Sequence, residues 1–137
     1  PAVSLALTGT MPFGFVVIGL GSMAWVAGFD VLYATADYEV DREQGLHSIP
    51  ARFGIPAALV ISRLLHATAI ILLAIAGVVL GAGALFGVGV LAAAVLLAYE
   101  QSLVSSNDLS KLNMAFFTMN GVIAVVFGAF VVIGEVI

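Results

Sequence analysis

Acidic and basic side chains gather in one short segment of this chain, residues 30–54, where they could bind a metal ion and a phosphate group. Its three aspartates, Asp30, Asp37 and Asp41, have the spacing i, i+7 and i+11. In an α-helix, which turns by about 100° per residue, such positions fall within roughly 40° of one another. The spacing therefore predicts three carboxylates on one helix face, with Tyr33 flanking that face.

Carboxylates placed side by side need a counter-charge, because like charges repel and are costly to desolvate. Mg2+ removes both costs, since it prefers carboxylate oxygens and waters and is commonly completed by substrate phosphates. Arg42, His47 and Arg52 follow the aspartates and could contact the anion, as arginine binds phosphate through paired hydrogen bonds. The segment predicts an Mg2+–diphosphate site, suited to a reaction in which diphosphate leaves.

The alternative is an acidic loop that is merely solvated at the end of a helix. That interpretation suits Glu39, Glu43, Glu100 and Asp108, which we expect to lie in water near the membrane surface. It suits Asp30 less well, because an ionisable residue near the end of an apolar span indicates function.

The composition requires an apolar solvent around the elements that carry this segment. The 137 residues are 63% hydrophobic and 9% charged, whereas soluble domains have about 45–50% apolar and about 25% charged residues. The absence of cysteine excludes a disulfide framework and a thiolate metal site. A net charge of -4 with only four basic residues argues against a nucleic-acid partner.

Four stretches reach the roughly 20 apolar residues that a helix needs to cross a bilayer. We expect these spans at residues 13–36, 56–80, 84–103 and 114–133. Residues 1–10 resemble the end of a preceding helix, and residues 37–55 are expected to form the loop of the aspartate motif. Because the chain begins with proline, we expect it to be a C-terminal piece of a longer membrane protein.

The few cations orient the expected bundle. Short connections make neighbouring spans antiparallel, which places Arg42, Arg52, Arg63 and Lys111 on one side. The positive-inside rule makes that side cytoplasmic. We therefore expect a multi-pass protein of the cell's inner membrane, with the aspartate segment facing the cytoplasm.

Two pairs of polar residues fall inside the expected spans. Arg63 and His66 share a face of the second span, and Asn113 and Asn120 share a face of the fourth. Polar groups at such depth must find partners. Hydrogen bonding between helices and lining of a substrate cavity are both open for each pair.

The pattern D-x-x-Y-A-x-x-D-x-x-x-D-x-x-x-G-x-x-S, from Asp30 to Ser48, resembles the second aspartate-rich motif of the UbiA prenyltransferase superfamily. The stretches LHSIPARFG and NDLSKLNMAFFTMNG are similar to the branch that prenylates 4-hydroxybenzoate or a related naphthoate in quinone synthesis. The resemblance implies an all-α membrane bundle, of which this chain would be the C-terminal half. It also implies Mg2+-dependent transfer of a polyprenyl group from its diphosphate to an aromatic acid.

The same resemblance assigns roles to individual residues. Asp30, Asp37 and Asp41 would hold Mg2+ beside Tyr33, and Ser48 would join the three basic side chains at the diphosphate. Two departures stand out. Many relatives have lysine where this chain has His47, and the family's first motif, of the N-D-x-x-D-x-x-x-D kind, is absent from the sequence. We expect that motif in an N-terminal half, without which residues 1–137 should be inactive.

Other functions remain possible at this stage. A cation-coupled transporter fragment is one, although transporters usually place their site near the bilayer midplane. A structural membrane subunit is another, but it leaves the aspartate spacing unexplained. Within the same superfamily, enzymes that make haem O, chlorophyll or archaeal lipids share the motif.

Overall fold

The computed structural model describes residues 2–136, which form an all-α protein. Its helices are α1 (Ala2–Thr8), α2 (Phe13–Tyr33), α3 (Tyr38–Glu43), α4 (Ile49–Phe53), α5 (Ile55–Leu80), α6 (Ala84–Ser102) and α7 (Asn120–Val136). A 3-10 helix, η1 (Ala34–Asp37), joins α2 to α3, and a π-helix, η2 (Met114–Met119), leads into α7. Strand pairing within the described residues is limited to an isolated bridge between Ser105 and Asp108.

Four helical runs are long and apolar enough to cross a membrane, judged by length and composition. They are Phe13–Glu43, Ile55–Leu80, Ala84–Ser102 and Met114–Gly134. The first run passes through η1 and α3, so the segment expected as a loop at residues 37–55 contains α3 and α4. The all-α membrane fold predicted from composition and span length is confirmed.

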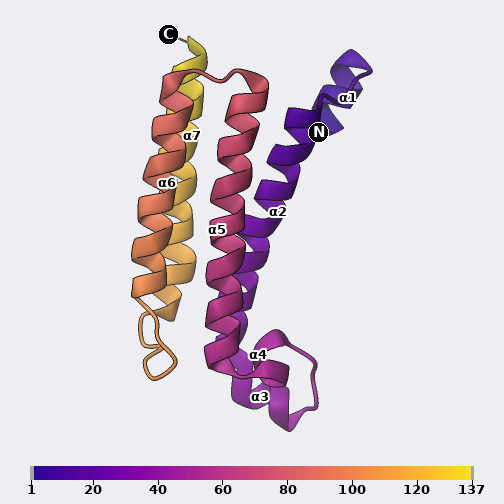
Figure 1. Cartoon of the computed structure of the whole chain (residues 1–137). Coiled ribbons are helices and arrows are strands. Elements are labelled where there is room, and N and C mark those ends of the chain that lie inside the picture. The colour runs from indigo at the N-terminus through magenta and orange to yellow at the C-terminus, as the bar shows by residue number, and fades with distance from the viewer. Residues whose placement is uncertain (1, 137) are drawn as a thin grey trace.

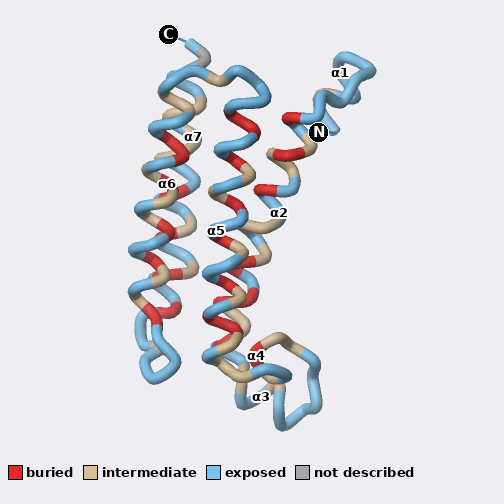
Figure 2. Tube along the Cα trace, viewed as in Figure 1, coloured by how far each residue is buried: buried red, intermediate tan, exposed pale blue. Residues whose placement is uncertain are grey.

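The four long helices associate as two pairs. Helix α2 packs along α5, and α6 packs along α7 (Figure 1). The pairs meet through buried side chains that include Phe29 of α2, Leu97 of α6 and Ile123 of α7. Buried residues lie on the sides of the long helices that face one another, whereas the outward sides are exposed (Figure 2).

The outward surface is strongly apolar. Val78 is 83% exposed and Val125 is 73% exposed, and many other large apolar side chains share this surface. Soluble monomers rarely expose contiguous apolar patches beyond a few hundred square ångströms. Lipid is the solvent that suits this surface, so the chain is a multi-pass membrane protein.

A glycine brings α2 and α5 together at the depth of the polar residues. A Cβ built on Gly28 would overlap the imidazole of His66, so only glycine permits the observed approach. Ser62, one turn before His66, donates from Oγ to the carbonyl oxygen of Gly28 over 2.8 Å. This contact fixes α2 two residues before Asp30, where the candidate site begins.

Candidate functional site

The end of α2 tightens between Asp30 and Asp37. Thr35 is buried and donates from Oγ1 to the carbonyl oxygen of Leu32 over 2.7 Å. Such back-bonding bends helices, and residues 34–37 form the 3-10 helix η1. A 3-10 helix turns by about 120° per residue, so four residues add roughly 80° of rotation relative to an α-helix. Asp37 is therefore displaced from the face that Asp30 occupies.

The structure does not bring the three aspartates together as a metal-binding site. Asp30 and Asp37 are exposed and Asp41 is half-buried. Among the side chains described in the structure, no three from His, Cys, Asp or Glu are placed to hold a metal ion. The single stripe assumed one continuous α-helix, and η1 interrupts that helix. The assignment of these carboxylates as Mg2+ ligands stays a prediction.

The predicted anion-binding side chains, in contrast, do come together. Arg42, His47 and Arg52 line one surface pocket of about 550 Å³. The turn between α3 and α4 makes this possible, because Gly45 adopts a left-handed φ of 70°. The next N–H, that of Leu46, donates to the carbonyl oxygen of Asp41 over 2.8 Å and closes the turn. Two guanidinium groups and an imidazole around one pocket suit a phosphate or diphosphate.

Two residues of the site also have local structural roles. Arg42 donates to the hydroxyl of Tyr38 over 3.1 Å, and its guanidinium lies 5.4 Å from the centre of that ring. Ser48 caps α4, because its Oγ accepts the N–H of Ala51 over 3.2 Å. The hydroxyl hydrogen of Ser48 remains available to donate to a phosphate oxygen.

Tyr33 packs against the fourth span. Its ring stacks on Phe116 at 4.3 Å between centroids and meets Phe117 edge-on at 5.7 Å. Offset or edge-on aromatic pairs add about 0.5–1.5 kcal/mol beyond their buried area. Tyr33 therefore holds the C-terminal end of α2 against η2, and its predicted role beside the carboxylates stays a prediction.

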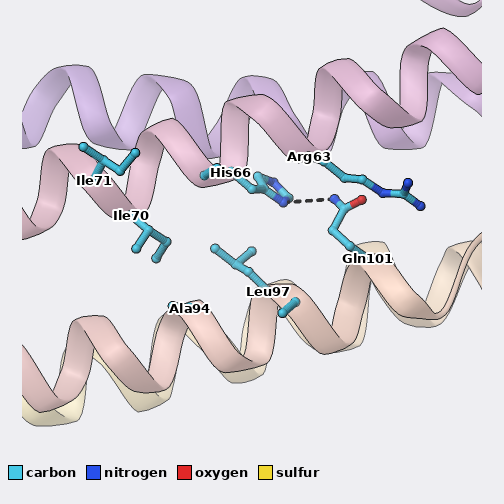
Figure 3. A pocket seen from close by; sticks show the side chains of 9 residues that line it. Arg63, His66, Ile70, Ile71, Ala94, Leu97 and Gln101 are labelled. Atoms are coloured by element: carbon cyan, nitrogen blue, oxygen red, sulfur yellow. Dashed lines mark hydrogen bonds between the residues drawn. The ribbon is translucent and has the colours of Figure 1, made fainter.

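Arg63 and His66 line a cavity of about 410 Å³ between α5 and α6 (Figure 3). His66 is buried, and Gln101 of α6 donates to its Nδ1 over 3.1 Å. The same Gln101 amide donates to Ser62 Oγ over 2.9 Å. Ser62 in turn binds Gly28, so one chain of hydrogen bonds crosses α6, α5 and α2. The hydrogen bond of His66 between helices is thus observed, whereas the lining of a substrate cavity by Arg63 and His66 stays a prediction.

The two asparagines do not share one stripe. Asn120 lines a different cavity, of about 310 Å³, with side chains of α2, α5 and α7, whereas Asn113 is exposed and does not line it. The prediction treated the intervening residues as α-helical. They form η2 instead, and a π-helix bonds from i to i+5, which rotates Asn120 away from Asn113.

The prediction that Glu100 is solvated is wrong. Its exposed fraction is 0%, and neither carboxylate oxygen has a hydrogen-bond partner among the described residues. Its Oε1 lies 3.8 Å from Nδ1 of His66, too far for a hydrogen bond, and that nitrogen already accepts from Gln101. The sequence contained a signal for this burial. Glu100 follows Ala93 at i+7 and Leu97 at i+3, so the three residues share the buried face of α6.

Asp108 is exposed, as expected. The side chain and N–H of Ser110 hold the pKa of Asp108 below its ordinary value. The N–H of Ser110 lies 2.9 Å from Asp108 Oδ1, within the connection between α6 and η2. This acid therefore shapes a loop and adds no group to the candidate site.

Comparison with known proteins gives a consistent result. The model of the UbiA prenyltransferase family matches residues 1–122. The 4-hydroxybenzoate octaprenyltransferases of Aeromonas salmonicida and Saccharophagus degradans are each 32% identical over 127 residues, which is 93% of this chain and 44% and 42% of theirs. The enzyme of that name from Azotobacter vinelandii is 34% identical over 100 residues, 73% of this chain and 34% of its own.

The chain thus spans less than half the length of these curated relatives. No solved structure matches it. The family match nevertheless extends over most of the 137 residues, and it includes the whole aspartate segment and the basic pocket. The chain therefore belongs to the UbiA prenyltransferase family.

Proposed function

We propose that this chain supplies the diphosphate-binding side of an enzyme that transfers a polyprenyl group from its diphosphate to an aromatic acid. The observation that carries the proposal is the pocket that gathers Arg42, His47 and Arg52 directly after the exposed Asp37 and the half-buried Asp41. A metal-bound diphosphate needs basic side chains for its oxygens and carboxylates for the metal, and this segment supplies both residue types.

The donor set fits Mg2+ shared with a substrate. Mg2+ usually takes one or two protein carboxylates and completes its shell with waters and substrate phosphates. Asp37 and Asp41 can supply those carboxylates, since neither is ion-paired with a basic side chain in the described part of the chain. When bound, Mg2+ would neutralise charge on the diphosphate and so favour its departure. Asp30 would contact a second ion or orient Tyr33.

The protein's own groups have simple tasks in this reaction. Arg42, His47 and Arg52 would hold the diphosphate oxygens and stabilise the charge that grows as the carbon–oxygen bond breaks. The diphosphate leaves with the bonding electrons. A ring carbon of the acceptor then bonds to the allylic carbon and loses its proton. The apolar interior of the bundle would exclude water, which would otherwise capture the allylic cation.

The relatives suggest the acceptor and the enzyme's other parts. Those that the chain matches are named 4-hydroxybenzoate octaprenyltransferases, which favours 4-hydroxybenzoate over the acceptors of other superfamily branches. Family membership removes the support for a transporter or a structural subunit. Because the relatives are more than twice as long, we propose that a further set of helices carries the first aspartate motif. The positive-inside rule favours the cytoplasmic face of the inner membrane for the site.

The experiment compares three variants of the complete protein. Each variant is produced from the protein's own gene and assayed in membranes. Asp37→Asn and Asp41→Asn should each nearly abolish formation of prenylated 4-hydroxybenzoate, because asparagine keeps the size of aspartate but loses its charge. Glu39→Gln is the matched control and should retain most of the rate, since Glu39 points about 160° away from Asp41 on α3.

Initial rates are measured against Mg2+ concentration, with the protein level checked by blotting. Removal of divalent cations by a chelator should stop the reaction, and added Mg2+ should restore it. Near-normal rates in both aspartate variants, with failure of Glu39→Gln, would show that the metal face is misassigned. Residues 1–137 alone in detergent should give no product, and clear turnover there would contradict the need for further helices.

A further inference from the structure

A second feature of the molecule lies away from the aspartate segment, along the line where α5 faces α6. Beyond Arg63, His66 and Gln101, the cavity of about 410 Å³ between these helices is lined by apolar side chains, including those of Ile70 and Ala94 (Figure 3). A second cavity of about 360 Å³ begins one turn further along both helices, at Ala74 and Val90, and reaches the turn that joins α5 to α6. Together the two cavities follow most of the length of α5 and α6, and we call them the α5–α6 groove.

The charged end of the α5–α6 groove lies at the depth of lipid phosphates. Arg63 is eight residues after Ile55, so it lies about 12 Å along the axis from the start of α5. The 26 residues of α5 extend about 39 Å, which exceeds the roughly 30 Å of a hydrocarbon core. Arginine at such a position extends its side chain toward the headgroups. The exposed Arg63 therefore reaches the membrane interface on the side of the aspartate segment.

Arg63 also lacks an internal counter-charge. Among the side chains that the structure describes, no carboxylate is ion-paired with it, and Glu100 lies instead beside His66. The other three basic side chains are likewise unpaired among the described residues, but Arg63 differs from them because it lies inside a helix that can span a membrane. An anion from outside the protein can supply the missing charge.

Gln101 adds a second recognition group at the same end. Its amide nitrogen is occupied by His66 and Ser62, whereas its Oε1 is buried and has no hydrogen-bond partner. A buried carbonyl oxygen without a partner is unfavourable, because it has lost its hydrogen bonds to water and gained none in return. A ligand hydroxyl next to the phosphate would satisfy that oxygen while the phosphate contacts Arg63.

We propose that the α5–α6 groove binds an anionic phospholipid with a hydroxylated headgroup. Its phosphate would lie on Arg63, a headgroup hydroxyl would donate to Gln101 Oε1, and an acyl chain would fill the groove between the two helices. The proposal does not rest on the proposed enzymatic function, because no residue of the basic pocket lines the groove.

The test measures lipid retention by native mass spectrometry of the protein purified from membranes in a mild detergent. The probes are phosphatidylglycerol, which is anionic and hydroxylated, and phosphatidylcholine, which is zwitterionic and has no headgroup hydroxyl. Wild-type protein should retain one phosphatidylglycerol in preference to phosphatidylcholine. Arg63→Gln should weaken that binding about fivefold, the equivalent of about 1 kcal/mol for one basic contact at a membrane surface.

Two further variants test the groove itself. Ala94→Phe places a ring inside the cavity and should reduce retention, whereas Val95→Phe, at the exposed neighbouring position, should not. Lys111→Gln removes an exposed cation that does not line the groove and controls for general electrostatic attraction. Arg63→Lys keeps the charge and should retain most of the binding, which guards against misfolding of Arg63→Gln.

Three outcomes would overturn the proposal. Equal retention of the two lipids, or equal retention by wild type and Arg63→Gln, would show that the groove has no anion site. Displacement of the lipid, one for one, by a polyprenyl diphosphate would assign the groove to the substrate. Loss of lipid only when the protein dimerises would assign it to a second copy of the chain.

Discussion

Replacing Gly28 with alanine tests whether the contact between α2 and α5 positions the start of the candidate site. The added methyl group would overlap the imidazole of His66. That ring cannot simply turn aside, because Phe29 meets it edge-on at 4.6 Å and Gln101 bonds to its Nδ1 over 3.1 Å. Either α2 moves away from α5, or His66 leaves its hydrogen bond.

The expected cost follows from these contacts. Forcing an extra methyl group into a packed interior costs about 1–3 kcal/mol, and loss of the bond between Gln101 and His66 adds about 1 kcal/mol. The better helix propensity of alanine returns roughly 0.5–1 kcal/mol. Gly28→Ala should therefore destabilise the protein by about 1–3 kcal/mol.

Gly128→Ala provides the matched control. Gly128 also lies inside a long helix, α7, but a Cβ there meets no heavy atom within 4 Å. Alanine should be neutral or stabilise by up to about 1 kcal/mol at this position. The free energy of unfolding would be measured by denaturant titration in mixed detergent micelles, and thermal unfolding would provide an independent check.

A double-mutant cycle with His66→Ala identifies the cause. His66→Ala alone should destabilise, because it removes the ring nitrogen that accepts from Gln101 and leaves a cavity in the interior. In that background the methyl group at position 28 occupies space that the imidazole has vacated, so the two changes should couple favourably by about 1–3 kcal/mol. Additive effects, or equal stability of the Gly28 and Gly128 variants, would refute the steric reasoning.

Three further predictions address other parts of the chain. Glu100→Gln should unfold no earlier than wild type in a thermal scan, because it replaces a buried carboxyl group that has no hydrogen-bond partner among the described residues with an uncharged amide of the same size; a large loss of stability would show that the carboxyl group makes a stabilising interaction. Ser48→Ala should speed amide hydrogen exchange at Ala51 about fivefold, since loss of an N-cap costs about 1 kcal/mol, and unchanged exchange would contradict the capping role. An impermeant thiol reagent added to whole cells should label Gly83→Cys but not Ser106→Cys, and the reverse pattern would invert the proposed orientation.

Much of the fold could be predicted from the sequence because the bilayer imposes a single requirement on each span. A helix that crosses lipid needs about 20 apolar residues, whatever its neighbours. The expected span at residues 56–80 corresponds to α5, which begins one residue earlier, at Ile55, and includes Pro56 in its first turn. The basic pocket was also predictable in part, since Arg42, His47 and Arg52 are close in sequence and a short turn suffices to join them.

The aspartate and asparagine stripes were less predictable because each assumed unbroken α-helical geometry. A hydrogen bond from Thr35 to Leu32 accompanies a 3-10 turn at the end of α2, and a π-helix precedes Asn120. Periodicity cannot indicate where a helix tightens or widens by a fraction of a turn. Yet a rotation of about 100° about the helix axis, which is the turn that one residue makes in an α-helix, is enough to move a side chain to another face.

The interior network shows why the remaining polar residues required the structure. Ser62, His66 and Gln101 are separated by up to 39 residues, yet they connect α6 and α5 to the carbonyl oxygen of Gly28. In lipid such groups cannot turn to water, so each one restricts how the helices pack. The network ends two residues before Asp30, at the one glycine where α2 can approach His66 closely. A substitution at Ser62, which lines neither the basic pocket nor the α5–α6 groove, should therefore displace the aspartate segment and alter the binding of diphosphate more than the binding of lipid.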